Sequence, residues 1–218
     1  YKITNDQHCL FNNENVKGCH AIVNSRELTS QTEVLREVIK TEKGYVLFMN
    51  HLGTEFSTEC LLSTTEFVYF KKYIYDNNKD SIPGTYQDNF EDIPELPLDT
   101  IPVPSIILDN EDTTFKVNKQ YRNKILKIYH KYIRVGSEYE INISYCDRKK
   151  FTQLFKDEQH WLDNESYKLM EIFTIFDGVI HQLMKLQNDS FRRFTNTDEY
   201  TNWKRDSINK NAKRISFK

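Results

Sequence analysis

The stretch Val117-Asn-Lys-Gln-Tyr121-Arg-Asn-Lys-Ile125-Leu-Lys-Ile128-Tyr-His-Lys-Tyr132 decides the fold class of this chain. Its apolar residues recur every three or four positions, so an α-helix would place all of them on one face. An apolar helix face has to be covered by other elements around a core. Gly136 follows as a helix-ending residue, and the pattern therefore predicts a long amphipathic helix that stops there.

The same spacing returns along most of the sequence. Gly44 is expected to stop a first helix, and Ser57 to be the N-cap of a third, with Glu59 in its first turn. The apolar residues of the first three helices are Leu35, Val38 and Ile39; Val46, Phe48, Met49 and Leu52; and Leu61, Leu62, Phe67, Phe70 and Ile74. No segment alternates convincingly as a strand, so the sequence predicts an all-α fold.

Three helices are expected after the long amphipathic one. Asp147 is a candidate cap for a helix with Phe151, and a further helix is expected from Leu169 to Leu186. A final helical stretch is predicted to start near Asp189 and Ser190, because both are good N-cap residues. It would carry Phe191, Phe194 and Tyr200.

Composition narrows the class of protein further. The 218 residues suit one domain or slightly more, and 38% hydrophobic with 13% aromatic residues can build a core. The net charge of −2 argues against a whole-domain nucleic-acid binder. The four cysteines form no C-x-x-C pair, which favours a reducing, cytoplasmic location, and no apolar run is long enough to span a membrane.

All five prolines fall in one strongly acidic window. Residues 76–112 hold ten Asp and Glu against Lys79 alone. Proline removes helix donors and like charges repel, so this window is expected to be a loop or a disordered insertion. Long insertions cost little loop-closure entropy, and this one need not separate two domains.

No motif for catalysis or cofactor binding is recognisable. The glycines are too scattered for a phosphate-binding loop, there is no H-E-x-x-H, and the six histidines lack ligand spacing. A metal site from Cys9, Cys19 and His20 is the one alternative left open. We therefore expect a non-enzyme that needs no cofactor and no metal.

A series of short motifs nevertheless follows a familiar order. The motifs are Leu35-Arg-Glu-Val-Ile-Lys-Thr-Glu-Lys-Gly44, Phe48, Leu52-Gly-Thr-Glu-Phe-Ser-Thr-Glu59, Phe70-Lys-Lys72, Ile128-Tyr-His-Lys-Tyr-Ile133, Glu140-Ile-Asn142, Arg148, Phe176-Asp177, Asp189-Ser-Phe-Arg-Arg-Phe194 and Tyr200. This order resembles the RGS domain, the regulator of G-protein signalling. The resemblance covers 27–203, with 1–26 as an N-terminal extension that would be helical and packed on the bundle, and 204–218 as a basic tail.

The resemblance implies a helical bundle of about nine helices that binds the α subunit of a heterotrimeric G protein. Such domains recognise the GTP-hydrolysis transition state and hold the switch regions in place. They contribute no catalytic group, because Gα supplies its own arginine and glutamine. The implied role is to terminate G-protein signalling in the cytoplasm or at the inner face of the plasma membrane.

By motif position, three segments would form the Gα-binding surface. They are Glu55, Phe56, Ser57, Glu59 and Cys60; Glu140 and Asn142; and Leu186 (or Met184), Asp189, Ser190 and Arg193. Asn142 would lie against the Gα glutamine, and Asp189 with Arg193 would line a threonine pocket. We expect Arg193 to pair with Asp189 or another acid. A purely structural interpretation, in which Glu59 is a first-turn acid and Asn142 a helix cap, stays open.

The chain departs from the family pattern at several places. Cys60 stands where most members have asparagine, and Ser63-Thr64 replace an aromatic pair, with Phe67 available to fill part of that volume. Insertions occupy 76–115 and 157–172. The departures leave open an alternative function, an RGS-like interaction scaffold without GTPase-activating activity.

The last sixteen residues form the basic segment. From Trp203 to the end, six Lys and Arg residues stand against Asp206. We expect a solvated or frayed tail. An anionic membrane surface is the alternative partner for 203–218, because cations near such a surface add attraction.

Overall fold

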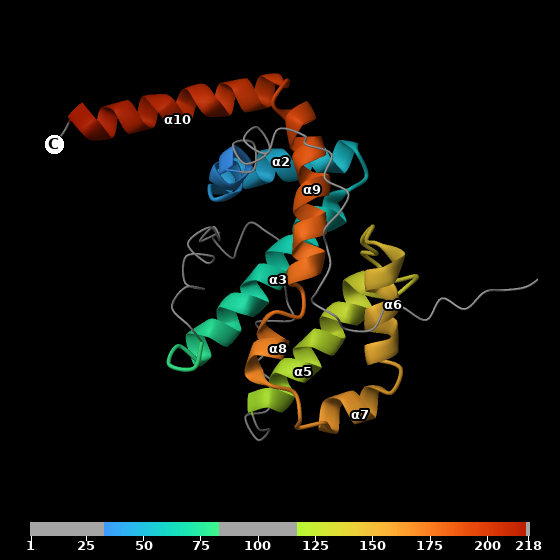
Figure 1. Ribbon diagram of the computed structural model, residues 1–218. Coiled ribbons are helices and arrows are strands. Elements are labelled where there is room, and N and C mark those ends of the chain that lie inside the picture. Colours follow the sequence, from blue (N-terminus) through green and yellow to red (C-terminus); the bar gives the residue numbers. More distant parts are fainter. Residues whose placement is uncertain (1–32, 83–116, 217–218) are drawn as a thin grey trace, which may run out of the picture.

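The computed structural model describes residues 33–82 and 117–216, and within them the chain is all-α, as predicted. Residues 33–39 are helical, and no strand occurs in either described range. The further elements are α2 (Glu42–Thr54), α3 (Thr58–Asn77), α5 (Val117–Ile128), the π-helix η2 (Tyr129–Ile133), α6 (Tyr145–Leu154), α7 (Glu158–Asp163), α8 (Leu169–Phe173), α9 (Asp177–Phe194) and α10 (Asp198–Ser216). Figure 1 shows α9 running through the middle of the bundle, with α10 leaving its upper end.

Two hydrophobic clusters pack along α9. The larger cluster joins α3, α5, η2, α6, α7 and α8 to the first half of α9, where Val179 and Leu183 are buried. The smaller cluster joins the helix at 33–39 and α2 to Phe191, Phe194 and Tyr200. One helix therefore contributes its buried face to both clusters and fixes them relative to each other.

The long amphipathic helix predicted from Val117 is present but changes its winding. It is α-helical to Ile128 and continues as a π-turn in which Arg134 N–H donates to Tyr129 O at 2.9 Å. The helix ends at Ile133, three residues before Gly136. Gly136 has a φ of +78°, a backbone conformation that suits a residue without a side chain. The wide turn keeps Tyr132 and Ile133 buried, while Lys131 reaches the buried Glu66 of α3 at 2.9 Å.

Gly44 does not stop a helix, contrary to the sequence-based prediction. It lies in the first turn of α2, where its N–H donates to the N-cap side chain of Thr41 at 3.1 Å. A Cβ at position 44 would stand 2.2 Å from Val38 O. Glycine is required here by the close approach of the preceding helix to α2, and the break between the two helices falls at 40–41.

The predicted helix boundaries after 168 are also wrong. The expected helix from Leu169 to Leu186 is divided at 174–176 into α8 and α9, which lets both Phe173 and Phe176 face the core. No helix starts at Asp189 and Ser190, because α9 passes through them without interruption. Their N-cap signal is overridden by the apolar face of α9, which needs the helix to continue to Phe194.

N-cap side chains form capping hydrogen bonds at the starts of α2, α6 and α7 in the described part of the chain. Ser57 is the N-cap residue of α3 as predicted, although its side chain makes no capping bond. For α6, Ser144 takes this position rather than Asp147 or Asn142, and its Oγ accepts from Asp147 N–H at 3.1 Å. Asp157 caps α7 by accepting from the His160 N–H.

The segment 157–172 is folded into the bundle. It contains α7, whose Trp161 is 1% exposed and donates through Nε1 to Arg122 O at 3.0 Å. The acidic window is described only up to Ile82, which is buried in the larger cluster, and α3 continues to Asn77. Predictions for 1–26 and for the remainder of the window at 83–115 lie outside the described residues.

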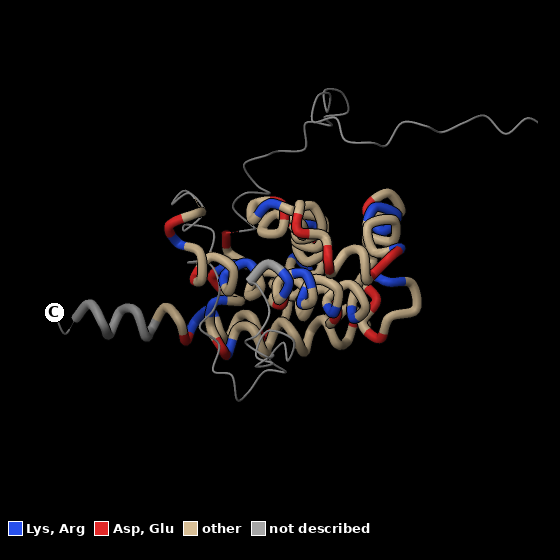
Figure 2. Tube along the Cα trace, turned by 90° about the horizontal axis from the view of Figure 1, so that it is seen from below, with Lys and Arg blue, Asp and Glu red and all other residues tan. Residues whose placement is uncertain are grey.

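The basic segment is not a frayed tail, since α10 is helical as far as Ser216. Figure 1 shows α10 projecting from the body of the molecule, and Figure 2 shows positive and negative positions interspersed over the other helices. No helix in the described ranges is long and apolar enough to cross a lipid bilayer.

Candidate protein-docking face

An ion pair between distant parts of the chain joins α9 to the turn between α2 and α3. Arg193 donates from Nε to Glu55 Oε1 at 2.5 Å and from Nη2 to Glu55 Oε2 at 2.8 Å. This two-bond geometry fixes both side chains more strongly than a single contact would. Arg193 was expected to pair with Asp189 or another acid, and its partner is Glu55.

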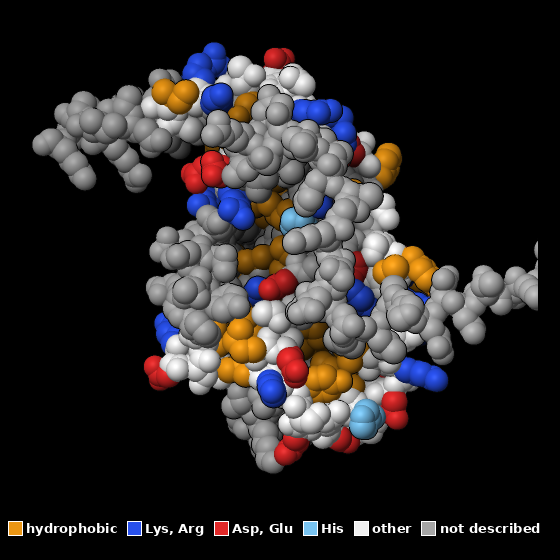
Figure 3. Space-filling model, in the orientation of Figure 1, with side chains coloured by type: hydrophobic (Ala, Val, Ile, Leu, Met, Phe, Trp, Pro, Cys, Tyr) orange, Lys and Arg blue, Asp and Glu red, His pale blue; other side chains and the backbone are white. Residues whose placement is uncertain are grey.

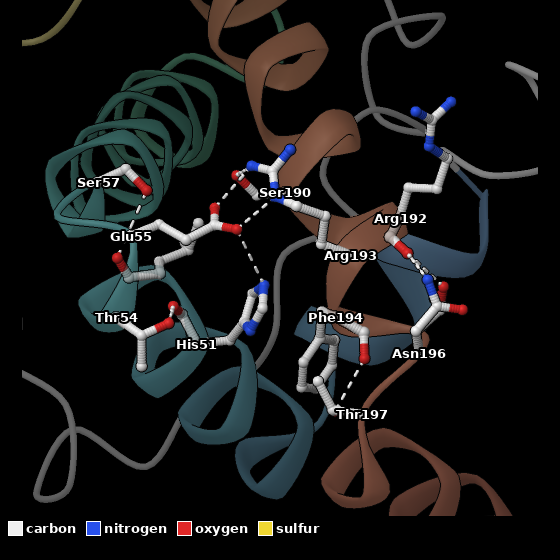
Figure 4. A network of polar contacts seen from close by, with 12 residues as sticks. His51, Thr54, Glu55, Ser57, Ser190, Arg192, Arg193, Phe194, Asn196 and Thr197 are labelled. Carbon is white, nitrogen blue, oxygen red and sulfur yellow. Dashed lines mark hydrogen bonds and ion pairs between the residues drawn. The ribbon is translucent and has the colours of Figure 1, made fainter.

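Two further side chains complete the cluster around Glu55 (Figure 4). Arg193 Nη2 also donates to Ser190 Oγ at 3.1 Å, and His51 Nε2 lies 3.3 Å from Glu55 Oε1. The hydrogen bond from Arg193 is the main cause that lowers the Glu55 pKa to about 2, against the opposing effect of burial. Glu55 is therefore ionised at neutral pH and holds the turn against α9.

The same turn presents Phe56 to solvent. Its side chain is 94% exposed and its φ is +52°, a conformation that a large side chain adopts only when the surrounding structure enforces it. Leu52 O enforces it by accepting from Glu55 N–H at 3.1 Å and from Ser57 N–H at 3.0 Å. A strained, fixed and exposed aromatic residue is characteristic of a binding surface.

The loop at 134–144 is held by Arg148 of α6. The Arg148 guanidinium donates to Ile133 O and, at 2.6 Å, to Ile141 O, so it bridges the two ends of the loop. Glu140 reinforces the bridge through Arg148 at 3.1 Å and accepts from Gly136 N–H at 2.7 Å. Asn142 is exposed between these fixed points.

A stripe of α9 connects this loop to the α2–α3 turn. Gln182, Leu186, Asp189 and Arg193 are spaced by four, three and four residues, which places them on one side of the helix. Gln182 Oε1 accepts from Ser144 N–H at 2.9 Å at one end, and Arg193 binds Glu55 at the other. At 1.5 Å per residue the two anchor points are about 16 Å apart. We call the turn 54–57, the loop 134–144 and this stripe the docking face.

Exposed hydrophobic side chains gather on the docking face. Of the seven large ones in the described residues, four lie on it or at its border: Phe56, Val135, Tyr145 and Leu186. Figure 3 shows hydrophobic side chains at the right-hand edge of the molecule, where Figure 1 places the α2–α3 turn and the start of α6. Exposed apolar residues surrounded by a rim of polar residues are typical of protein–protein interfaces.

Two residues predicted on this surface turn inward. Cys60 is 5% exposed, and burial raises the pKa of its thiol to about 12. Ser190 is 7% exposed and contributes to the face only through Arg193. Glu59, in the first turn of α3, is partly exposed beside Ser57. The remaining predicted residues lie on the docking face.

A buried polar contact joins α3 to α9 next to Cys60. Gln187 Nε2 donates to Cys60 O at 3.1 Å and to Thr64 Oγ1 at 2.7 Å. Ser63 is fully buried and donates to Glu59 O at 2.6 Å. Phe67 fills the neighbouring core volume by stacking on Phe176, with ring centroids 4.6 Å apart. Ser63 is thus satisfied within α3, and Thr64 by its hydrogen bond from Gln187 of α9.

Several residues that contribute to the docking face were not identified from the sequence. His51, Gln182 and Tyr145 were not predicted, and Arg148 carried no assigned role. Their only signal was proximity in sequence to the three motifs. No group of three His, Cys, Asp or Glu side chains that could hold a metal occurs in 33–82 or 117–216, and Cys9, Cys19 and His20 lie outside these ranges.

Comparisons of the chain with protein-family models, with curated proteins and with solved structures found no match. The docking face is therefore characterised by its own geometry, a braced turn, a braced loop and the α9 stripe that joins them. An arrangement of this kind offers shape and polar contacts to a partner.

Proposed function

We propose that this chain is an RGS-type domain that binds a heterotrimeric G-protein α subunit in its GTP-hydrolysis transition state and accelerates hydrolysis. The observation that carries the proposal is the convergence of the three motif-derived segments on one side of α9. Those segments are separated by up to 138 positions in sequence, as between Glu55 and Arg193. Their joint placement is what the resemblance demands of a Gα-binding surface.

The proposed mechanism requires a rigid docking face and no catalytic group from this chain. Gα carries its own catalytic arginine and water-positioning glutamine, so a partner can accelerate hydrolysis by stabilising the switch regions in their transition-state geometry. The bidentate Glu55–Arg193 pair and the Arg148 bridge hold the face in shape before the partner arrives. A preorganised surface pays less conformational entropy on binding.

Asn142 and Asp189 are the side chains through which the face would contact Gα. Both are exposed: Asn142 lies in the loop 134–144, and Asp189 belongs to the α9 stripe, four residues before Arg193. We expect Asn142→Ala and Asp189→Ala each to weaken binding about tenfold or more, as for interface positions that lose a central polar contact. Arg192→Ala is the matched control, because Arg192 lies on the same helix turn as Arg193 and points away from Glu55 (Figure 4).

The test is single-turnover GTP hydrolysis by a panel of Gα subunits, together with binding to Gα in the GDP, GDP–aluminium fluoride and GTP-analogue states. Acceleration of hydrolysis and preference for the aluminium fluoride state are the expected results. Wild-type behaviour of both Asn142→Ala and Asp189→Ala would contradict the assignment of the face, and no acceleration with any Gα would contradict the function.

Burial of Cys60 favours a second candidate, an RGS-like scaffold without GTPase-activating activity. Position 60 presents no amide to the docking face, since the Cys60 side chain is inside and its carbonyl is bound by Gln187. A scaffold would bind its partner equally in all three nucleotide states of Gα, or would bind a different protein. The same binding assay distinguishes a scaffold from the first proposal, which predicts a preference for the aluminium fluoride state of Gα.

A further inference from the structure

A groove on α10 lies outside the docking face and is unused by the proposed function. Its volume is about 430 Å³, and it is lined by Thr195, Tyr200, Thr201, Lys204, Arg205 and Ile208. Thr201, Lys204, Arg205 and Ile208 follow the spacing three, one and three, which places them on one side of the helix.

The opposite side of α10 packs against the bundle. Trp203 packs on the smaller hydrophobic cluster, and Lys43 of α2 binds Asp206 at 2.9 Å. The negative charge of Asp206 is therefore balanced by a cation from another helix. Lys204 and Arg205 lie exposed on the groove side. Ile208 also lines the groove, and its side chain is 59% exposed.

Positive charge increases toward the end of the chain. Beyond Ile208 the sequence contains Lys210, Lys213, Arg214 and Lys218 and no acidic residue. Figure 1 shows α10 projecting from the other helices, and Figure 3 shows hydrophobic and basic side chains next to each other on its described half. A projecting helix with cations around an exposed apolar residue is suited to a surface rather than to a core.

We propose that the groove side of α10 binds the anionic headgroups of a phospholipid membrane. Lys204 supplies a point charge, and Arg205 supplies a planar group that can bind a phosphate with two hydrogen bonds. Ile208 is placed to enter the boundary between headgroups and acyl chains.

The same groove is poorly suited to nucleic acid. Single-stranded nucleic acids need exposed aromatic rings on which bases stack. The ring of Tyr200 is 7% exposed and is held edge-on against Phe191 and Phe194, with centroid distances of 5.9 and 5.5 Å. The net charge of −2 over the chain also disfavours long polyanions.

Flotation of the full chain with vesicles tests this proposal without any G protein, so its failure leaves the proposed function untouched. We expect binding to phosphatidylcholine vesicles that contain phosphatidylserine, no binding to pure phosphatidylcholine, and loss of binding at high salt. Each cation near an anionic surface contributes about a fivefold gain, so Lys204→Gln/Arg205→Gln should weaken binding by about thirtyfold.

Lys72→Gln/Lys79→Gln is the matched control, because it removes the same charge from exposed positions in the last part of α3 and just after it, away from α10. Equal binding to both vesicle types, or equal loss in the two double variants, would overturn the proposal. Ile208→Asn provides a second, charge-neutral variant, and it should weaken vesicle binding severalfold. Binding of single-stranded RNA that competes with the vesicles at similar affinity would also overturn it, since the site would then be a general polyanion site.

Discussion

The two hydrophobic clusters differ in how they support the docking face. The larger cluster holds 23 buried residues and carries the loop 134–144 directly on η2 and α6. The smaller one holds ten and carries the turn 54–57 at the end of α2. The loop is therefore held by the larger hydrophobic cluster and by Arg148. The turn is held by the smaller cluster and by the Glu55–Arg193 ion pair.

This difference indicates where the face can be broken. A change in the larger cluster should act on the stability of the entire described bundle, since α9 belongs to both clusters. A change at Glu55 or Arg193 should act locally, because exposed ion pairs add little to global stability. The predictions below follow this gradient from the centre of the larger cluster to the turn.

The largest effect is expected for Phe67→Ala. Phe67 is fully buried, stacks on Phe176 at 4.6 Å and meets Tyr132 edge-on at 5.8 Å. Removing the ring should cost about 4 kcal/mol through lost burial and the resulting cavity. Denaturant unfolding measures this cost, and Phe56→Ala, at an exposed site, should change stability by less than about 0.5 kcal/mol. Equal effects of the two variants would contradict the assignment of the core.

The next effect concerns the buried acid of α3. Glu66 is fully buried and its partner Lys131 also lies over the Tyr132 ring at 4.9 Å. Lys131→Met should destabilise by about 3 kcal/mol, because it leaves a buried carboxylate without its cation. The double variant Glu66→Gln/Lys131→Met should recover most of the loss. A double variant as unstable as the single one would show that the charge of Glu66 is not the cause.

The loop end of the face is tested by Arg148→Ala. This change removes the hydrogen bonds to Ile133 O and Ile141 O and the ion pair with Glu140. We expect a loss of about 2 kcal/mol, as for buried carbonyls left without a charged donor, and faster amide exchange confined to 134–144. Lys149→Ala, one residue along α6, is the control. Unchanged exchange in the loop would show that other contacts hold it.

Helical spacing in the sequence was sufficient to predict the all-α class and the helices at 42–54, 58–77 and 145–154 to within a few residues. It failed where packing overrides local signals. Asp189 and Ser190 look like a helix start, yet the apolar face that ends at Phe194 carries α9 past them. Gly44 resembles a helix-ending residue, but it lies in the first turn of α2, where the backbone of Val38 leaves no room for a side chain.

The site was predicted in part for a related reason. Motif order identified Glu55 and Arg193, but the bond between them is a tertiary contact that no local pattern encodes. Inward rotation of Cys60 follows from its position on the α3 side that faces Gln187 of α9. Residues such as Gln182 become part of the face only because the loop at 144 returns to α9.

The smallest effect is expected at the turn end, for Arg193→Ala. The Glu55 pKa is lowered to about 2 in the folded chain, below its ordinary value, so the pair stabilises the fold at neutral pH. This contribution is fully present above the ordinary carboxylate pKa of about 4.3 and is lost as pH falls through about 2. Because Arg193 is largely exposed, solvent screening should keep this contribution small.

Stability of wild type and Arg193→Ala, measured by denaturant titration from pH 7 to pH 2, checks this prediction. The difference between the two should be largest at neutral pH and should narrow on acidification, while Arg192→Ala should follow wild type throughout. A constant difference would assign the effect of Arg193 to packing instead of charge. If, in addition, amide exchange in the variant rises at 54–57 and stays unchanged at 134–144, the two ends of the docking face are stabilised independently, as the unequal clusters require.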